Sequence, residues 1–94
     1  SKRGKLRAHV LIKGRVQGVF FRAETCRQTR RLGIVGWVRN RWDSRVEAVF
    51  EGEEKAVQRM VTWCYKGPPD AIVEDVEIKW EDFEGEFTGF SICH

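Results

Sequence analysis

The spacing of apolar residues along this chain of 94 residues switches twice between the period of a strand and the period of a helix. Every second residue from Leu6 to Ile12 is apolar, which predicts a strand over residues 6–13 with one buried face. Apolar residues at positions 56, 57, 60, 61 and 64 instead follow the spacing of a buried helical face. Gly67-Pro68-Pro69 ends that helix. A chain this short must pack both patterns around one core.

The remaining segments complete the order of strands and helices. A polar, helix-compatible stretch covers residues 22–32, and Gly33 is suited to its C-terminal cap. Strands are expected at 34–40, at 46–50, around Val76–Trp80 and, as a possible short fifth strand, at 87–92. The order β-α-β-β-α-β predicts an α+β fold, the ferredoxin-like split-βαβ sandwich: an antiparallel sheet with two helices on one face. We expect a single domain over residues 6–94 after a flexible basic tail at 1–5.

Charge is distributed unevenly between the two halves of the chain. Residues 1–47 hold 13 Lys/Arg against 3 Asp/Glu, a net charge of +10, whereas residues 48–94 hold 4 against 11, a net charge of −7. A site built from the first half would therefore favour an anionic partner, either a metabolite or a nucleic acid. Charge alone does not exclude the simpler interpretation, in which both sets of side chains only solvate the surface.

Cysteine, histidine and hydropathy patterns narrow the class of protein further. The three cysteines, Cys26, Cys64 and Cys93, are widely spaced and favour free thiols over a disulfide framework. His9 and His94 form no metal-ligand spacing with them, so we expect no metal site. The sequence has no apolar run of about 20 residues and no signal-peptide pattern, which indicates neither a membrane span nor export. We therefore expect a cytoplasmic protein without a membrane partner.

The predicted topology places three segments at one edge of the sheet. In a split-βαβ unit the first two strands run parallel on either side of the third, so their carboxyl ends lie together, roughly 9.6 Å apart. The loop Gly14–Phe20, Arg22 at the helix start and Asn40 at the end of the second strand should therefore meet there. Glycines in a loop that leads into a helix let backbone amides surround an anion, and Arg22 adds a planar cation that matches phosphate.

Two segments carry a family resemblance. GRVQGVFFR at Gly14–Arg22 and LGIVGWVRN at Leu32–Asn40 closely resemble the two signature segments of acylphosphatases, and VEAVFEG at Val46–Gly52 and GPPDAIV at Gly67–Val73 resemble later segments of that family. The resemblance implies hydrolysis of an acyl phosphate to a carboxylate and inorganic phosphate, without a cofactor or a metal. We also expect a monomer. It implies that Arg22 and Asn40 are catalytic, with Asn40 holding the attacking water. It also implies that backbone amides bind the phosphate, and these belong to Val16, Gln17, Gly18, Val19, Phe20, Phe21 and Arg22.

Neighbouring residues receive supporting roles in this interpretation. We expect Phe20, Phe21 and Trp37 to pack the fold rather than to contact substrate, and Gln17 to shape the loop. We expect the arginines at positions 15, 41 and 45 to raise the local positive potential. The turn after Asn40 holds Asp43-Ser44 where the family often has Asp-Gly, and the ending Ser91–His94 is less familiar, so the hairpin and the last strand are the least determined parts.

Two other functions remain as alternatives. The fold and the anion site could serve a phosphate-metabolite sensor without turnover, or a domain attached to a larger carbamoyl-transfer enzyme. Retention of both Arg22 and Asn40 favours an enzyme, because a sensor has little use for a water-holding residue. RNA binding is the weaker alternative: the third strand lacks stacking aromatics, and Glu47 and Glu51 would repel phosphates.

Overall fold

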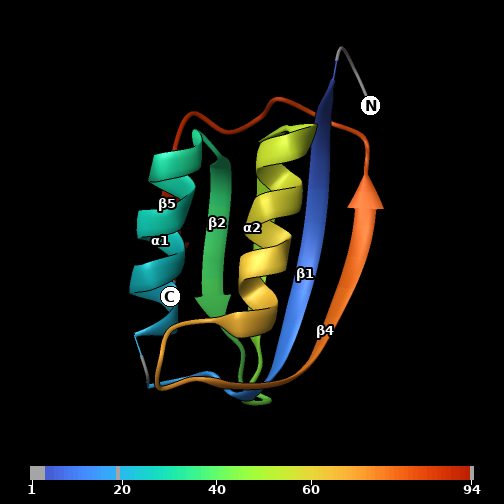
Figure 1. The fold of residues 1–94 in the computed structure, drawn as a ribbon. Coiled ribbons are helices and arrows are strands. Elements are labelled where there is room, and N and C mark those ends of the chain that lie inside the picture. Colours follow the sequence, from blue (N-terminus) through green and yellow to red (C-terminus); the bar gives the residue numbers. More distant parts are fainter. Residues whose placement is uncertain (1–3, 19, 94) are drawn as a thin grey trace.

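A computed structural model describes residues 4–18 and 20–93 of the chain. Two helices lie side by side in front of one sheet (Figure 1). The strands are β1 (Lys5–Arg15), β2 (Val35–Asn40), β3 (Val46–Glu53), β4 (Ile72–Glu81) and β5 (Phe90–Cys93), and the helices are α1 (Phe21–Leu32) and α2 (Glu54–Lys66). The predicted element order is confirmed, including the fifth strand.

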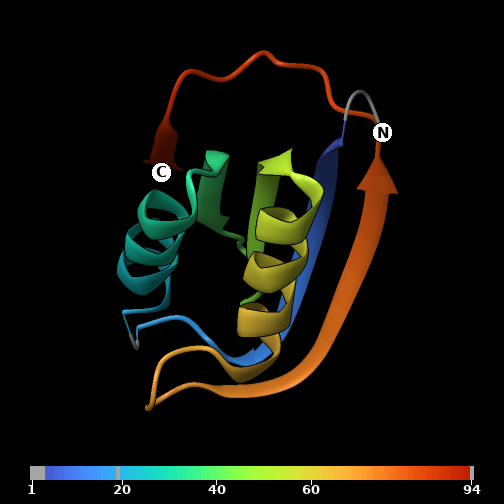
Figure 2. The ribbon, with the colours of Figure 1, turned by 45° about the horizontal axis from the view of Figure 1, so that its top comes forward.

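The sheet has the order β4-β1-β3-β2-β5. β3 lies between β1 and β2 and runs antiparallel to both, with Val10 opposite Ala48 and Val38 opposite the same Ala48. This is the predicted ferredoxin-like arrangement, but the sheet is not wholly antiparallel, because β5 pairs parallel to β2. The reason is the path of the chain: segment 82–89 crosses at one end of the sheet, so β5 runs opposite to β4 and in the direction of β2 (Figures 1 and 2).

The core lies between the sheet and the two helices. The alternation from Leu6 to Ile12 places Ala8, Val10 and Ile12 there, all fully buried. From the helices, Phe21 and Trp63 meet with ring centroids 5.5 Å apart. Both helices end at the predicted glycines: the Gly33 amide donates to the Thr29 carbonyl and the Gly67 amide to the Trp63 carbonyl. Each helix and each central strand buries one apolar face in this core, and that burial holds the helices against the sheet.

The opposite face of the sheet carries charged side chains that are paired with one another. Arg7 on β1 lies 3.2 Å from the Glu51 carboxylate on β3 and 2.9 Å from that of Glu81 on β4. It also contacts Glu84 at 3.3 Å and Glu86 at 2.8 Å, in the segment that crosses to β5. Arg7 thus ties the crossover segment to the sheet. That segment crosses at the end of the sheet away from the loops that follow β1 and β2 (Figure 1).

Candidate active site

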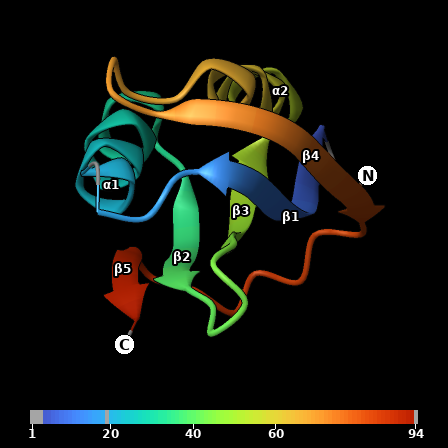
Figure 3. The same ribbon diagram turned by 90° about the horizontal axis from the view of Figure 1, so that it is seen from below.

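The carboxyl ends of β1 and β2 and the start of α1 lie at the same end of the molecule. Seen from that end, the chain leaves β1, crosses beside β2 and enters α1, while β2 continues into the hairpin that leads to β3 (Figure 3). Because β3 separates two strands of the same direction, this arrangement follows from the sheet order itself. The predicted meeting of the Gly14–Phe20 loop, Arg22 and Asn40 at one edge is therefore confirmed as an arrangement of backbone segments.

Glycines make the backbone of the loop possible. Gly14 sits at an irregularity in the pairing of β1 with β4 and has φ +133°, and a Cβ atom there would lie 2.1 Å from the Ile72 carbonyl oxygen. Gly18 has φ +75°, in the left-handed region that glycine adopts without strain. Between them the side chain of Val16 is fully buried and anchors the loop to the core. Of the predicted phosphate-binding residues, Val19 lies outside the described residues.

The start of α1 leaves backbone donors available. The first helical hydrogen bond runs from the Glu24 amide to the Phe20 carbonyl, at 3.0 Å. The amides of Phe21, Arg22 and Ala23 precede this bond, so they have no carbonyl partner within the helix. These amides and the positive end of the helix dipole favour an anion at this point.

Arg22 is the second residue of α1 and is half-buried. Within residues 4–18 and 20–93, no carboxylate lies within 4.0 Å of its guanidinium, although most arginines on the open sheet face are paired. Arg22 lines a pocket of about 380 Å³ together with Gly18, Phe20, Phe21, Ala23 and Ile92. Its charge is therefore available to an anion that enters this pocket.

Asn40 is the last residue of β2, and its position alternates with the buried Gly36 and Val38 on the face that the helices cover. Its side-chain Oδ1 is buried and has no hydrogen-bond partner in the described part of the chain. An unsatisfied buried acceptor costs about 1–3 kcal/mol, so such an atom is normally paired with water or ligand. The geometry thus leaves Asn40 one acceptor with which to hold a donor such as water.

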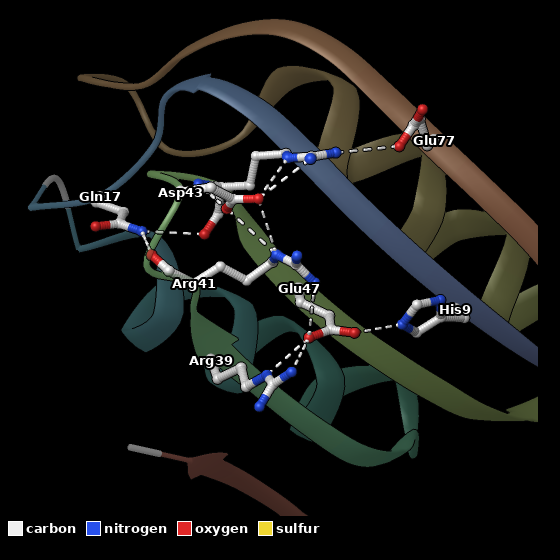
Figure 4. Close-up of polar contacts among 8 residues, drawn as sticks. His9, Gln17, Arg39, Arg41, Asp43, Glu47 and Glu77 are labelled. Atoms are coloured by element: carbon white, nitrogen blue, oxygen red, sulfur yellow. Dashed lines mark hydrogen bonds and ion pairs between the residues drawn. The ribbon is translucent and has the colours of Figure 1, made fainter.

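Gln17 joins the loop to the β2–β3 hairpin. Its Nε2 donates to the carbonyl oxygens of Arg41, at 2.8 Å, and Arg45, at 3.0 Å (Figure 4). Both carbonyls flank the hairpin turn, which begins one residue after Asn40. The expectation that Gln17 shapes the loop is confirmed, and the contact also fixes the loop relative to the strand that carries Asn40.

The expectation that three aromatic residues only pack the fold is wrong for one of them. Phe21 is buried at 2% exposure and Trp37 is half-buried, whereas Phe20 is 78% exposed. The cause is its backbone: Phe20 caps α1 with φ 60° and ψ 22°, a left-handed conformation, whereas Phe21 is already helical and faces the core. Phe20 therefore stands in solvent at the mouth of the pocket that holds Arg22.

Two of the arginines predicted to raise the local potential have carboxylate partners. Arg41 contacts Asp43 at 3.2 Å, and Arg45 contacts Asp43 at 3.1 Å and Glu77 at 3.3 Å. Their charge is thus largely compensated, while Arg15 is exposed. Desolvation alone would raise the pKa of the Asp43 carboxyl, but hydrogen bonds from Arg41 and from the Arg45 amide outweigh it and lower that pKa below its ordinary value.

Sequence reasoning missed the cluster around Glu47. This residue is only 6% exposed, and its carboxylate lies 2.6 Å from His9 Nε2 and 2.6 Å from Arg39 Nη2 (Figure 4). Burial would raise the pKa of Glu47, but the hydrogen bonds from His9 and Arg39 outweigh it, so the pKa is lowered. The alternation from Leu6 to Ile12 placed His9 on the face of the first strand away from the core. No strand register was predicted from the sequence, so His9 could not be paired with Glu47, which lies diagonally across from it on β3.

The sequence also led to expectations about metal ligands, membrane-spanning helices and thiols, and the structure bears on each of these for residues 4–18 and 20–93. Within them, no three His, Cys, Asp or Glu side chains come together as metal ligands, and no helix is long and apolar enough to cross a bilayer. Cys26, Cys64 and Cys93 are free thiols. Full burial raises the pKa of the Cys64 thiol, which makes it a poor nucleophile.

Three groups therefore lie at one edge of the sheet: Arg22, the first amides of α1 and the buried Oδ1 of Asn40, and none of them has a partner among residues 4–18 and 20–93 that would satisfy it. The acylphosphatase family model matches residues 8–92. Acylphosphatases from Roseiflexus sp. and Pelotomaculum thermopropionicum are 62% and 52% identical, over 92% and 95% of this chain and 92% and 97% of theirs. A solved acylphosphatase from Coxiella burnetii superposes with a TM-score of 0.92 at 32% identity, covering 98% of this chain and 96% of that one.

The chain belongs to the acylphosphatase family, and the predicted enzyme class, a hydrolase of acyl phosphates, is confirmed.

Proposed function

We propose that Arg22 and the backbone amides of residues 16–22 bind the phosphate of the acyl phosphate, and that Asn40 orients the water that attacks it. The observation that carries this proposal is a pair of polar groups at one edge of the sheet that have no partner within the described residues: the guanidinium of Arg22 has no carboxylate, and the buried Oδ1 of Asn40 has no donor. The first group needs an anion and the second needs a hydrogen-bond donor. A phosphate with a water beside it supplies both.

The reaction requires little of the protein beyond binding the phosphate and aligning the water. Phosphoryl transfer depends mainly on positioning and on stabilising charge on the equatorial oxygens, which a planar guanidinium and several amides can do. The carboxylate released from an acyl phosphate is a good leaving group, so the water needs alignment more than deprotonation. An asparagine amide can align it but cannot act as a base. The proton of the water passes instead to a phosphate oxygen of the substrate.

The setting of the reaction is also part of the proposal. It includes action as a monomer on a small-molecule substrate. Three free thiols, two of them buried, support a reducing compartment such as the cytoplasm. No second macromolecule is needed to complete the site.

Hydrolysis of benzoyl phosphate, followed by its ultraviolet absorbance, tests these assignments. Arg22→Ala should lower kcat/KM by on the order of 10³-fold or more and weaken competitive inhibition by inorganic phosphate. Asn40→Ala should lower kcat while leaving phosphate inhibition intact, because it removes an interaction with water rather than with phosphate. Arg15→Ala is the matched control: it removes an exposed arginine of the same segment and should change kcat/KM little.

Circular dichroism should show that all three variants are folded. Full turnover by Asn40→Ala would contradict the water-holding role, and non-competitive inhibition by phosphate would place the anion site elsewhere. A folded wild type that binds phosphate but releases no product would favour the sensor alternative.

A further inference from the structure

Phe20 has two unfavourable features that do not contribute to the stability of the fold: an exposed aromatic side chain and a left-handed backbone. It is a large aromatic side chain with 78% of its surface exposed, so it gains little from burial. Its backbone has φ 60° and ψ 22°, a left-handed conformation that costs a residue other than glycine roughly 1–2 kcal/mol. Strain of this kind on an exposed residue is a reason to look for a function at that position.

The surroundings of Phe20 indicate what that function is. Phe20 lines the same pocket of about 380 Å³ as Arg22, and the other side chains around it are those of Phe21, Ala23 and Ile92. Ile92 comes from β5, whose parallel pairing places it beside Val38 on the helix-covered side of β2. Among the described residues of the lining, Arg22 is thus the one charged side chain, and the walls next to it are apolar.

We infer that this pocket is the acyl subsite and that Phe20 and Ile92 form its apolar walls. The inference rests on the proposed function, in which Arg22 and the loop amides hold the phosphate. A phosphate held there has its acyl oxygen and carbonyl carbon within one or two bonds, so the rest of the acyl group must lie against the neighbouring walls. The subsite therefore favours acyl phosphates with an aromatic ring or an alkyl chain larger than methyl.

The aromatic ring of Phe20 suits this role for a physical reason. A substrate ring or chain laid against it covers apolar surface on both partners, and that surface is already exposed in the free enzyme. Burial of the ring is therefore available as binding energy for the substrate. Trp42, at 91% exposure on the β2–β3 hairpin, does not line this pocket, so exposure of an aromatic residue alone does not define the subsite.

The test compares kcat/KM for benzoyl phosphate with kcat/KM for acetyl phosphate. Phe20→Asn keeps a residue that tolerates the left-handed backbone but removes the apolar wall. It should lower kcat/KM for benzoyl phosphate about tenfold more than kcat/KM for acetyl phosphate, because the loss of an apolar contact to a substrate is usually worth about that factor. Phe20→Leu should retain most of the preference, and Trp42→Ala should leave both values unchanged.

Inhibition by inorganic phosphate is the second readout. An unchanged inhibition constant in Phe20→Asn would show that the loop amides keep their positions, so that a selective loss belongs to the acyl group. An equal loss for both substrates, or no loss for either, would overturn the acyl subsite. Absence of turnover of both substrates by the wild type would instead overturn the proposed function.

Discussion

Removal of Arg7 should lower the free energy of unfolding more than removal of any exposed arginine. Its side chain is 13% exposed, and that of its partner Glu51 is fully buried. Arg7→Met keeps a flexible chain of similar length but deletes the contacts to Glu51, Glu81, Glu84 and Glu86. Of the donors that the structure describes, the backbone amide of Glu84, at 2.9 Å, is then the one left to the Glu51 carboxylate.

The size of the effect follows from the burial of Glu51. Breaking a buried ion pair by removing one partner costs about 3–5 kcal/mol, because the remaining charge is left uncompensated. A domain of this length has a free energy of unfolding of roughly 5–14 kcal/mol, from about 0.05–0.15 kcal/mol per residue. Arg7→Met should therefore remove about a fifth of the stability or more. The other three carboxylates are more exposed and add less.

Urea denaturation followed by tryptophan fluorescence measures this change as a lower midpoint at constant m-value. Arg27→Met is the matched control: Arg27 is 73% exposed and makes one loose contact to Glu24 at 3.6 Å, so its loss should cost under about 1 kcal/mol. Arg7→Met with Glu51→Leu should recover much of the loss, because no buried charge is stranded. A loss of under about 1 kcal/mol in Arg7→Met alone would refute this account of Glu51.

Three further expectations concern the hairpin, the loop and the open sheet face. Ser44 has φ 73°, so Ser44→Gly should raise the free energy of unfolding by about 1 kcal/mol and the melting temperature by about 4–8 °C; an unchanged melting temperature would contradict the strain argument. Gly14→Ala would bring a Cβ atom within 2.1 Å of the Ile72 carbonyl oxygen, so the melting temperature should fall and inhibition by phosphate should weaken. A variant with native phosphate inhibition would show that the loop does not depend on this close approach. The pKa of Glu47 is lower in the folded protein than its ordinary value of about 4.3, so its stabilisation is present above that pH and is lost as the pH falls through the folded pKa. The difference in unfolding free energy between the wild type and Glu47→Gln should therefore shrink on acidification below about pH 4, and a pH-independent difference would be inconsistent with this linkage.

Local patterns in the sequence were sufficient for most of the fold. Alternation from Leu6 to Ile12 and the Gly67-Pro68 stop are short-range signals, and the structure follows both. The parallel pairing of β5 could not be predicted from the sequence, because the four residues Phe90–Cys93 do not indicate which strand they will join. That choice depends on where segment 82–89 crosses the sheet, and the crossing is fixed in part by Arg7, more than 70 residues earlier in the sequence.

The site could be predicted as a place but not in its details. Topology and resemblance were enough to put Arg22 and Asn40 at one edge. The orientation of Phe20 depends on a single left-handed residue before α1, and no composition rule marks a phenylalanine for that conformation. Likewise, the carboxylates that compensate Arg41 and Arg45 could be assigned only when the hairpin geometry and the neighbouring strand β4 were known.

The position of β1 in the sheet also limits the rate at which the chain can fold. β1 is the first strand in the sequence, yet it is flanked by β3 and β4, so that Arg7 lies opposite both Glu51 and Glu81. Each pairing closes a loop of more than 30 residues before any hydrogen bond of that ladder can form, because the nearest pairs are Ile12 with Val46 and Arg15 with Ile72. The entropy of closure must be overcome first. We therefore expect folding in milliseconds to seconds, as for other chains dominated by distant pairings. During synthesis, β1 has neither neighbour until β3, and then β4, has left the ribosome.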